Sequence, residues 1–242
     1  MNFKPAYSYF SQIYDPVMQH IDFRSWAEFI LSAYREYAIK EPKSILDIGC
    51  GTGELLAYFP KKVYKCGVDN SLEMLEIARK KNPQINFIYG DMEKLKMPST
   101  YDLIVSTHDS INYLTDFDKL HDHFSAIYST LKTDGLYYFD VSSEYNLEVN
   151  FHRKVFREKH GDISLVWENF YDKKKREILS VLTFRQSGEE YVEEHRQRFY
   201  SQAEIKSILK HAKLQLLRIG SDYKTWSLDR KAALIGFLCR KK

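Results

Sequence analysis

Short apolar runs alternate with stretches of helical periodicity between residues 43 and 141. Apolar runs bounded by turn residues predict buried strands, and apolar positions three and four residues apart predict helices. The predicted strands cover residues 44–48, 63–68, 86–89, 101–106 and 136–141, and the predicted helices cover residues 53–59, 71–81 and 116–131. Because strands and helices alternate with short turns, this region is predicted to be an α/β, doubly wound parallel sheet with helices on both faces.

The pattern changes after Val141. Residues 163–171, 178–185 and 191–200 alternate apolar and polar positions and are separated by turn-forming residues, which predicts an antiparallel sheet. A helix over residues 201–213 and two strands, over residues 214–220 and 231–239, follow. The first forty residues are aromatic-rich and helical in pattern, with a break at Asp15-Pro16.

Three parts are therefore expected. Residues 1–40 form an N-terminal helical cap segment, residues 41–145 and 201–242 form the main α/β domain, and residues 146–200 form an antiparallel β insertion. The alternation of strands and helices resumes only after the antiparallel segment, so the insertion belongs within one domain.

Composition and charge narrow the classes of partner. The 36 basic and 33 acidic residues leave a net charge of +3, which is too weak a field to indicate nucleic acid or an acidic membrane. No run of about 18 apolar residues that would span a membrane and no secretory signal is visible. The three cysteines lack metal-ligand spacing. These features predict a cytoplasmic monomer or homodimer without a metal site.

The strongest chemical signal is the segment Asp47-Ile48-Gly49-Cys50-Gly51-Thr52-Gly53-Glu54, which follows a predicted strand and opens a helix. Glycine at every second position lets the backbone turn tightly and approach a ligand closely. A dinucleotide-binding loop has glycine at the sixth position, where this chain has Glu54. Asp47 would repel a pyrophosphate but suits a cationic or hydroxylated ligand. The loop therefore favours a nucleoside without phosphates.

Acidic residues also end the next two strands. The carboxylate of Asp69, in Asp69-Asn70, can accept both hydroxyls of a ribose, although a helix-capping role is the structural alternative. In Gly90-Asp91-Met92, Asp91 can accept an adenine amino group while Met92 and Met74 pack against the ring, or Asp91 can be a turn residue. All of these positions lie at the carboxyl ends of adjacent strands, where open α/β sheets bind ligands.

Residues 43–141 resemble the class I methyltransferases that use S-adenosylmethionine (SAM). The glycine segment matches their first motif, Asp69 matches the ribose-binding acid, and Gly90-Asp91-Met92 matches the adenine-side motif. The resemblance implies a Rossmann-like, seven-stranded, mostly parallel sheet whose last strand is antiparallel. It also implies SAM as the cofactor, S-adenosylhomocysteine as its product, and Gly49, Gly51 and Gly53 beside the methionine and ribose portions.

A finer resemblance covers most of the rest of the chain. The segments 108–114 and 194–201, together with Tyr14 and Trp26, are similar to sugar-amine and glycine-type N-methyltransferases that carry a β-sheet lid. This resemblance implies that Tyr14 and Trp26 close over the cofactor. It further implies methyl transfer to a nitrogen or oxygen of a small-molecule acceptor.

Other methyltransferase chemistries lack their sequence signals. The position after the fourth strand has Ser106-Thr107-His108-Asp109, without the proline pair of DNA and many RNA and protein N-methyltransferases. No cysteine follows proline, so a cysteine nucleophile is disfavoured. Methylation of RNA or protein and SAM binding without turnover stay as alternatives, although the residues of segment 151–200, 11 basic and 9 acidic, argue against RNA.

Candidates for the acceptor side follow from the chemistry of SAM. Its sulfonium makes the methyl group electrophilic, so the protein mainly has to align the acceptor, and a base helps only when the acceptor arrives protonated. His108 and Asp109 on the cofactor rim, and His195 and Arg198 on the lid, are the candidates. Arg198 can pair with a carboxylate or phosphate, or with Glu193 or Glu194. The alternative for His195 is a rim position on a strand of mixed charge.

Overall fold

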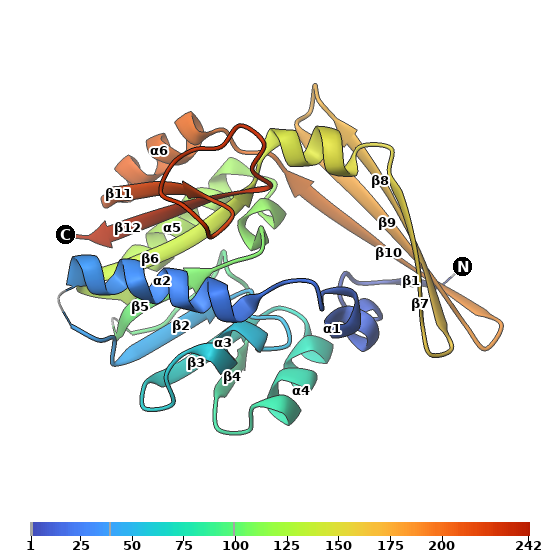
Figure 1. Cartoon of the computed structure of the whole chain (residues 1–242), viewed down its shortest axis with the longest axis horizontal. Coiled ribbons are helices and arrows are strands. Elements are labelled where there is room, and N and C mark those ends of the chain that lie inside the picture. Colours follow the sequence, from blue (N-terminus) through green and yellow to red (C-terminus); the bar gives the residue numbers. More distant parts are fainter. Residues whose placement is uncertain (1, 39, 99) are drawn as a thin grey trace.

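The computed structural model describes residues 2–38, 40–98 and 100–242, which form two β-sheets joined side by side (Figure 1). The larger sheet has seven strands in the order β11-β12-β6-β5-β2-β3-β4. Only β12 runs antiparallel to its two neighbours, as expected for the last strand. Its strands are β2 (Ser44–Ile48), β3 (Tyr64–Asp69), β4 (Asn86–Tyr89), β5 (Tyr101–Ser106), β6 (Leu131–Ser142), β11 (Leu214–Ser221) and β12 (Leu234–Lys241).

Helices cover both faces of this sheet, which confirms the α/β, doubly wound prediction. One apolar core lies under α2 (Phe23–Ala38), α3 (Glu54–Tyr58) and α4 (Leu72–Lys81), and a second lies under α5 (Phe117–Thr130) and α6 (Gln202–His211). Helix α6 begins with a capping box in which Ser201 and Glu204 satisfy each other's backbone N–H groups. Helix α2 packs into the core of the main sheet, so it is not part of a separate cap.

The second sheet contains the antiparallel strands β7 (Val155–His160), β8 (Ile163–Asp172), β9 (Glu177–Gln186) and β10 (Glu189–Arg198). We call these four strands the lid. A π-helical turn, Asn146–Phe151, leads into them from β6. The short strand β1 (Asn2–Lys4) joins the sheet parallel to β10. The sequence pattern missed β1 and β7 because both are mostly exposed and lack a buried apolar face.

The N-terminal segment lies between the two sheets (Figure 1). A 3-10 turn, Phe10–Ile13, and the short helix α1 (Tyr14–Val17) pack against apolar side chains of β8 and β9. Asp15 fastens the segment to the main sheet, since its carboxylate accepts from Thr52 Oγ1 and from Lys81 Nζ, each at 2.6 Å. The predicted break at Asp15-Pro16 is wrong, because both residues lie within α1, where a first-turn proline sacrifices no helical hydrogen bond.

The side chain of Asn112 connects the lid to the main sheet. Asn112 is fully buried in the 3-10 turn Ser110–Tyr113 that follows β5. Its Nδ2 donates to the carbonyl oxygen of Arg198 on β10 at 2.6 Å, and its Oδ1 accepts from the backbone N–H of Ser142 at the end of β6 at 2.9 Å. The end of β10 is thereby held beside the end of β6.

Replacing Asn112 by alanine is expected to lower the free energy of unfolding by about 2–5 kcal/mol. Each buried backbone group left without a partner costs about 1–3 kcal/mol. Urea unfolding followed by circular dichroism measures the change. Asn86→Ala is the matched control, because Asn86 is exposed and its amide contacts only Cys66 Sγ, at 3.9 Å. Equal stability of the two variants would contradict the role given to Asn112.

Candidate functional site

The glycine loop after β2 turns through three residues in the left-handed region, with φ of 74° at Gly49, 52° at Gly51 and 74° at Gly53. A Cβ at Gly49 would lie 2.6 Å from Ser110 Oγ, so this position requires glycine for packing. A Cβ at Gly51 would meet no protein atom within 4 Å. Gly51 instead faces a cavity of about 250 Å³ at the carboxyl ends of β2, β3 and β5.

Ten of the predicted cofactor residues line this cavity, which we call the first cavity. They are Tyr14, Asp47, Gly49, Cys50, Gly51, Asp69, Asn70, Met74, Met92 and His108. They come from the ends of four strands, from the N-terminal segment and from α4. The sequence motifs therefore meet at one place, as the rule for open α/β sheets requires.

Two carboxylates stand side by side in the wall of the first cavity. Asp69 shapes the loop, because its Oδ2 accepts from the Gly51 N–H at 2.8 Å and its Oδ1 from the Ser71 N–H at 2.9 Å. Asp47 is 2% exposed, and its Oδ1 has no hydrogen-bond partner among the described residues. Burial and the nearby charge of Asp69 raise the pKa of Asp47 to about 8. This oxygen needs a cationic or hydrogen-bond-donating ligand.

His108 and Asp109, which follow β5, are held in a strained shape. Both have positive φ, 57° and 50°, which is uncommon for residues other than glycine. The fully buried carboxylate of Asp140 fixes them, since it accepts from the His108 N–H at 2.9 Å and from the Asp109 N–H at 2.6 Å. Burial, with a smaller effect from His20, lowers the pKa of His108 to about 4. Its imidazole is therefore neutral at physiological pH, and its Nδ1 lies 3.2 Å from the Tyr14 hydroxyl.

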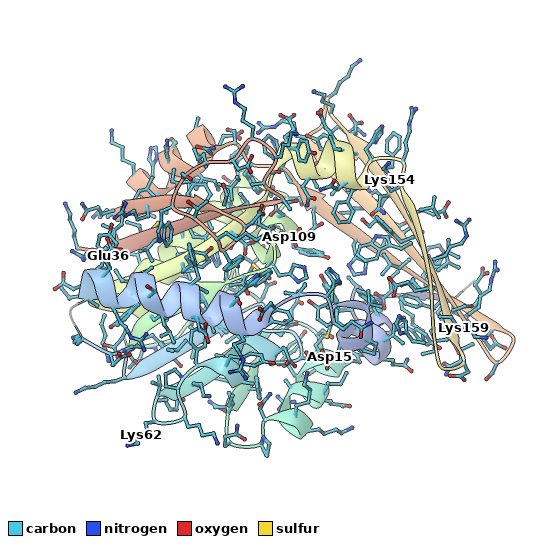
Figure 2. All side chains as sticks on the ribbon, in the orientation of Figure 1. Asp15, Glu36, Lys62, Asp109, Lys154 and Lys159 are labelled. Atoms are coloured by element: carbon cyan, nitrogen blue, oxygen red, sulfur yellow. The ribbon has the colours of Figure 1, made fainter. Side chains whose placement is uncertain are left out.

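A second, smaller cavity of about 70 Å³ adjoins the first. The two cavities share four lining residues, Tyr7, Tyr14, His108 and Tyr113. The second cavity lies under the lid, and Figure 2 shows Asp109 between the two sheets. Burial and the neighbouring Asp140 raise the pKa of Asp109 to about 8.

The lid candidates take different positions. His195 lines the second cavity and is only 4% exposed, so it does not lie on an open rim. Arg198 lies outside the lining of both cavities, where its guanidinium stacks on Phe117 at 4.9 Å. It pairs with neither Glu193 nor Glu194 within the part of the chain that the structure describes. This position does not support acceptor binding by Arg198.

The fold and its motifs agree with the known proteins that this chain is similar to. Residues 45–135 match a family described as "Methyltransferase domain". A protein of Geobacillus sp. (strain WCH70) that is named as a methyltransferase is 31% identical over 246 residues, covering 98% of this chain and 100% of that protein. The chain belongs to the SAM-dependent methyltransferase family.

Solved structures extend this comparison beyond residues 45–135 to nearly all of this chain. A SAM-dependent methyltransferase from Clostridium acetobutylicum ATCC 824 superposes with a TM-score of 0.85 at 28% identity, covering 97% of this chain and 98% of that one. The sugar N-methyltransferase KedS8 from Streptoalloteichus sp. ATCC 53650 has a TM-score of 0.76 at 18% identity, covering 95% and 93%, which shows a shared fold. The lid is therefore part of a known methyltransferase architecture.

SAM is the cofactor of this methyltransferase, and the first cavity fits it. We propose that Asp47 faces a positive charge of SAM, since its buried Oδ1 has no partner within the described part of the chain. We propose the open face of Gly51 as the surface on which the cofactor lies, and Asp69 as the acid that receives the ribose hydroxyls. Asp69 also accepts from the Ser71 N–H just before α4, but the side chain that caps this helix is that of Ser71 itself.

Four predicted cofactor residues lie outside the lining of the first cavity. Trp26 stacks on Tyr223 at 4.0 Å, and Phe23 from the same helix lines the cavity instead. A Cβ at Gly53 would meet Phe87, and one at Gly90 would meet Val68, so both glycines serve packing. Asp91 accepts from the Glu93 N–H at 3.1 Å, as a turn aspartate does.

Some residues that line the first cavity were not predicted from the sequence. Pro5, Ala6 and Tyr7 of the N-terminal segment line the first cavity, and so do Ser110 and Tyr113. The last two belong to segment 108–114, whose resemblance to the family was the available signal. Tyr7 had no signal beyond the aromatic content of its segment.

Residues 2–38, 40–98 and 100–242 contain no group of three His, Cys, Asp or Glu side chains placed to hold a metal ion. The three cysteines are buried and free. In the same ranges, no helix has the length and apolar character needed to cross a bilayer.

Gly51→Val is expected to abolish measurable SAM binding, because the new side chain occupies the first cavity. Gly161→Val is the matched control, since Gly161 also has positive φ, 62°, and open space at its Cβ, but lies on a lid turn. Isothermal titration calorimetry with SAM measures the effect, and thermal unfolding shows that both proteins are folded. A folded Gly51→Val variant that binds SAM like the parent would refute the placement.

The affinity for S-adenosylhomocysteine, whose ammonium group is cationic, is expected to rise with pH and to level off above about pH 8. Below that pH the free protein carries a proton on Asp47, which a bound cation displaces, so affinity falls by up to about tenfold per pH unit. Calorimetry from pH 6 to 9 gives the slope. Asp47→Asn, which cannot ionise, should bind weakly with a flatter slope, and an unchanged slope would contradict this role.

Proposed function

We propose that this methyltransferase moves the methyl group of SAM to a nitrogen or oxygen of a small metabolite bound in the second cavity. The observation that carries the proposal is the shared wall. Four side chains, Tyr7, Tyr14, His108 and Tyr113, face both cavities, so an acceptor in one lies next to a cofactor in the other.

Methyl transfer from SAM depends mainly on the alignment of the acceptor atom with the methyl group. SAM supplies an electrophilic methyl group, and the electron pair of the broken S–C bond stays on sulfur. The protein contributes by holding the acceptor in line and by excluding water, and such positioning is worth roughly 7–11 kcal/mol of barrier. The rings of Tyr7, Tyr14 and Tyr113 surround the junction of the cavities and can stabilise a nearby cation by about 0.5–2 kcal/mol.

The second cavity favours a small, partly polar acceptor. Its walls are largely aromatic, with Phe10 from the N-terminal segment, Phe151 from the π-helical turn and Trp167 from β8. The indole Nε1 of Trp167 is buried and has no partner in the ranges that the structure describes, so it supports an acceptor that carries an oxygen. Asp109 supplies a carboxyl group for an amine or hydroxyl, and the His195 imidazole forms part of the wall.

The likeness in fold to the sugar N-methyltransferase KedS8 supports a small-molecule acceptor. RNA is less favoured, because the near balance of charges on the lid offers little attraction for phosphates. We also propose a cytoplasmic location and a monomeric or homodimeric state.

Transfer from radiolabelled SAM into a cell extract separated into small molecules, RNA and protein tests the acceptor class. Label in the small-molecule fraction is the expected result, and mass analysis of that product identifies the acceptor. Label only in RNA or protein would overturn the small-molecule proposal. Binding of SAM without label in any fraction would favour a binding protein without turnover.

Above about pH 8, where the Asp109 carboxyl group is ionised, Asp109→Asn is expected to reduce kcat/KM for the labelled small molecule by about 10–100-fold, which corresponds to the loss of one charge-assisted hydrogen bond of about 1.5–3 kcal/mol. Asp134→Asn is the matched control, because Asp134 also has a positive φ, 61°, but lies at an exposed position near the start of β6, outside the lining of both cavities. Steady-state kinetics compare both variants with the parent. Equal losses, or none, would remove Asp109 from the acceptor site.

A further inference from the structure

A chain of four hydrogen-bonded side chains runs from the lid into the junction of the two cavities. The Tyr7 and Tyr113 hydroxyl oxygens lie 2.7 Å apart, Tyr113 Oη lies 2.8 Å from His195 Nδ1, and His195 Nε2 lies 3.0 Å from Glu193 Oε2. Glu193 is fully buried and His195 nearly so. Both nitrogens of the imidazole are engaged, so His195 has no free nitrogen for a ligand.

The other partners of Glu193 fix the direction of these bonds. Its Oε1 accepts from the backbone N–H groups of Tyr9, at 2.5 Å, and Phe10, at 2.9 Å, and its Oε2 accepts from that of Tyr7, at 2.8 Å. A carboxylate that accepts these bonds also accepts from His195 Nε2–H. His195 Nδ1 is then unprotonated and accepts from the Tyr113 hydroxyl, which in turn accepts from Tyr7.

Tyr7 is the open end of the chain. Its hydroxyl has one hydrogen-bond partner among the described residues, Tyr113, and its side chain lines both cavities. The backbone of Tyr7 has φ of 65°, a conformation that costs a residue with a side chain about 1–3 kcal/mol. The hydrogen bond from its N–H to Glu193 holds that conformation. The same carboxylate therefore fixes the position of Tyr7 and forms the opposite end of the hydrogen-bonded chain.

We propose that this chain removes the proton from the acceptor atom as that atom is methylated. The proposal rests on the proposed function and adds the path of the proton. The acceptor N–H or O–H bond breaks and its proton passes to Tyr7 Oη, the Tyr7 proton passes to Tyr113, and the Tyr113 proton passes to His195 Nδ1. The resulting imidazolium is stabilised by the Glu193 carboxylate and releases its proton to water after the product leaves.

In this scheme Tyr7 is the catalytic residue, and Tyr113, His195 and Glu193 act through it. Burial raises the pKa of Tyr7 and of Tyr113 well above the usual range, so both hydroxyls stay neutral and relay a proton without ionising. The other ionisable groups around the chain are Tyr14 on α1 and His108 and Asp109 after β5, which line the second cavity; burial lowers the pKa of His108 to about 4, so it is neutral. Phe10 and Ser180, from the N-terminal segment and β9, carry no charge there.

Tyr113→Phe interrupts the chain and tests the proposal. With radiolabelled SAM and the small-molecule extract, kcat at neutral pH is expected to fall about 100-fold or more, the usual range for lost acid–base catalysis. The KM and the Kd for S-adenosylhomocysteine are expected to stay within about threefold of the parent. The deficit should shrink as pH rises, because an acceptor that loses its proton to water no longer needs the chain. A purely structural role would give a deficit independent of pH.

Tyr9→Phe is the matched control. Tyr9 lies on the same segment, but its hydroxyl donates to Gln186, outside both cavities, and only its backbone bonds to Glu193. Parent-like kinetics are expected for it. Glu193→Gln gives a second interruption that retains the shape of the side chain, with the same pH-dependent deficit expected. Parent-like kcat in folded Tyr113→Phe and Glu193→Gln variants would overturn the proposal.

A measurement without any substrate separates this proposal from the proposed function. Nitrogen-15 NMR of histidine-labelled protein, with His195→Gln for assignment, reports which ring nitrogen carries the proton. The Nε2–H tautomer is expected, and an Nδ1–H tautomer would overturn the relay whatever the acceptor is. Absence of label in every extract fraction would instead count against the proposed function, while the tautomer would still decide the direction of the chain.

Discussion

The buried carboxylate of Glu193 is the interaction on which the arrangement of this molecule depends. It stands on β10 of the lid, is fully buried, and accepts hydrogen bonds from three backbone N–H groups of the N-terminal segment and from His195. A buried charge is tolerated only when such partners surround it. This side chain therefore connects the lid to the N-terminal wall of the first cavity and to the tyrosines between the cavities.

The other buried carboxylates around the site follow the same physical rule, with one exception. Asp69 and Asp140 accept from backbone N–H groups and so fix the glycine loop and the strained turn after β5. Asp47 has an oxygen that finds no partner in residues 2–38, 40–98 and 100–242. The protein satisfies the carboxylates that shape the backbone and leaves one unsatisfied in the cavity wall. That difference supports the role proposed for Asp47 toward a positively charged ligand.

Most of the main sheet could be predicted because its strands are short apolar runs, as at Ile45 and Leu46, followed by glycine or an acidic residue. The cofactor loop could be predicted because its motif is local in sequence. Strand β1 could not be predicted, because three exposed residues carry no periodic pattern. Strand β7 could not be predicted either, because its charged side chains show no alternation of apolar and polar positions. Trp26 was implied by the resemblance and Arg198 by its ability to pair with an anion, but tertiary stacking on Tyr223 and Phe117 takes both away from the cavities.

The acceptor side depends on contacts between residues far apart in the chain. Tyr7 and Tyr113 are separated by 106 positions, and His195 lies a further 82 positions along. No local periodicity encodes such a meeting. The sequence therefore revealed the cofactor better than the surroundings of the acceptor, because only the cofactor loop is built from consecutive residues.

The pairing of β1 with β10 also bears on how the protein avoids association. A sheet with free edges offers unpaired N–H and C=O groups to other chains. In the lid sheet, β1 covers β10 at residues 191–193, and Asn112 binds the carbonyl of Arg198 at the far end of that strand. The opposite edge, β7, carries Arg157, Glu158 and Lys159, whose charges discourage another strand from adding. By pairing with β10, the first few residues therefore hinder edge-to-edge aggregation. This effect is separate from the proposed catalytic role of Tyr7, which follows them in the chain.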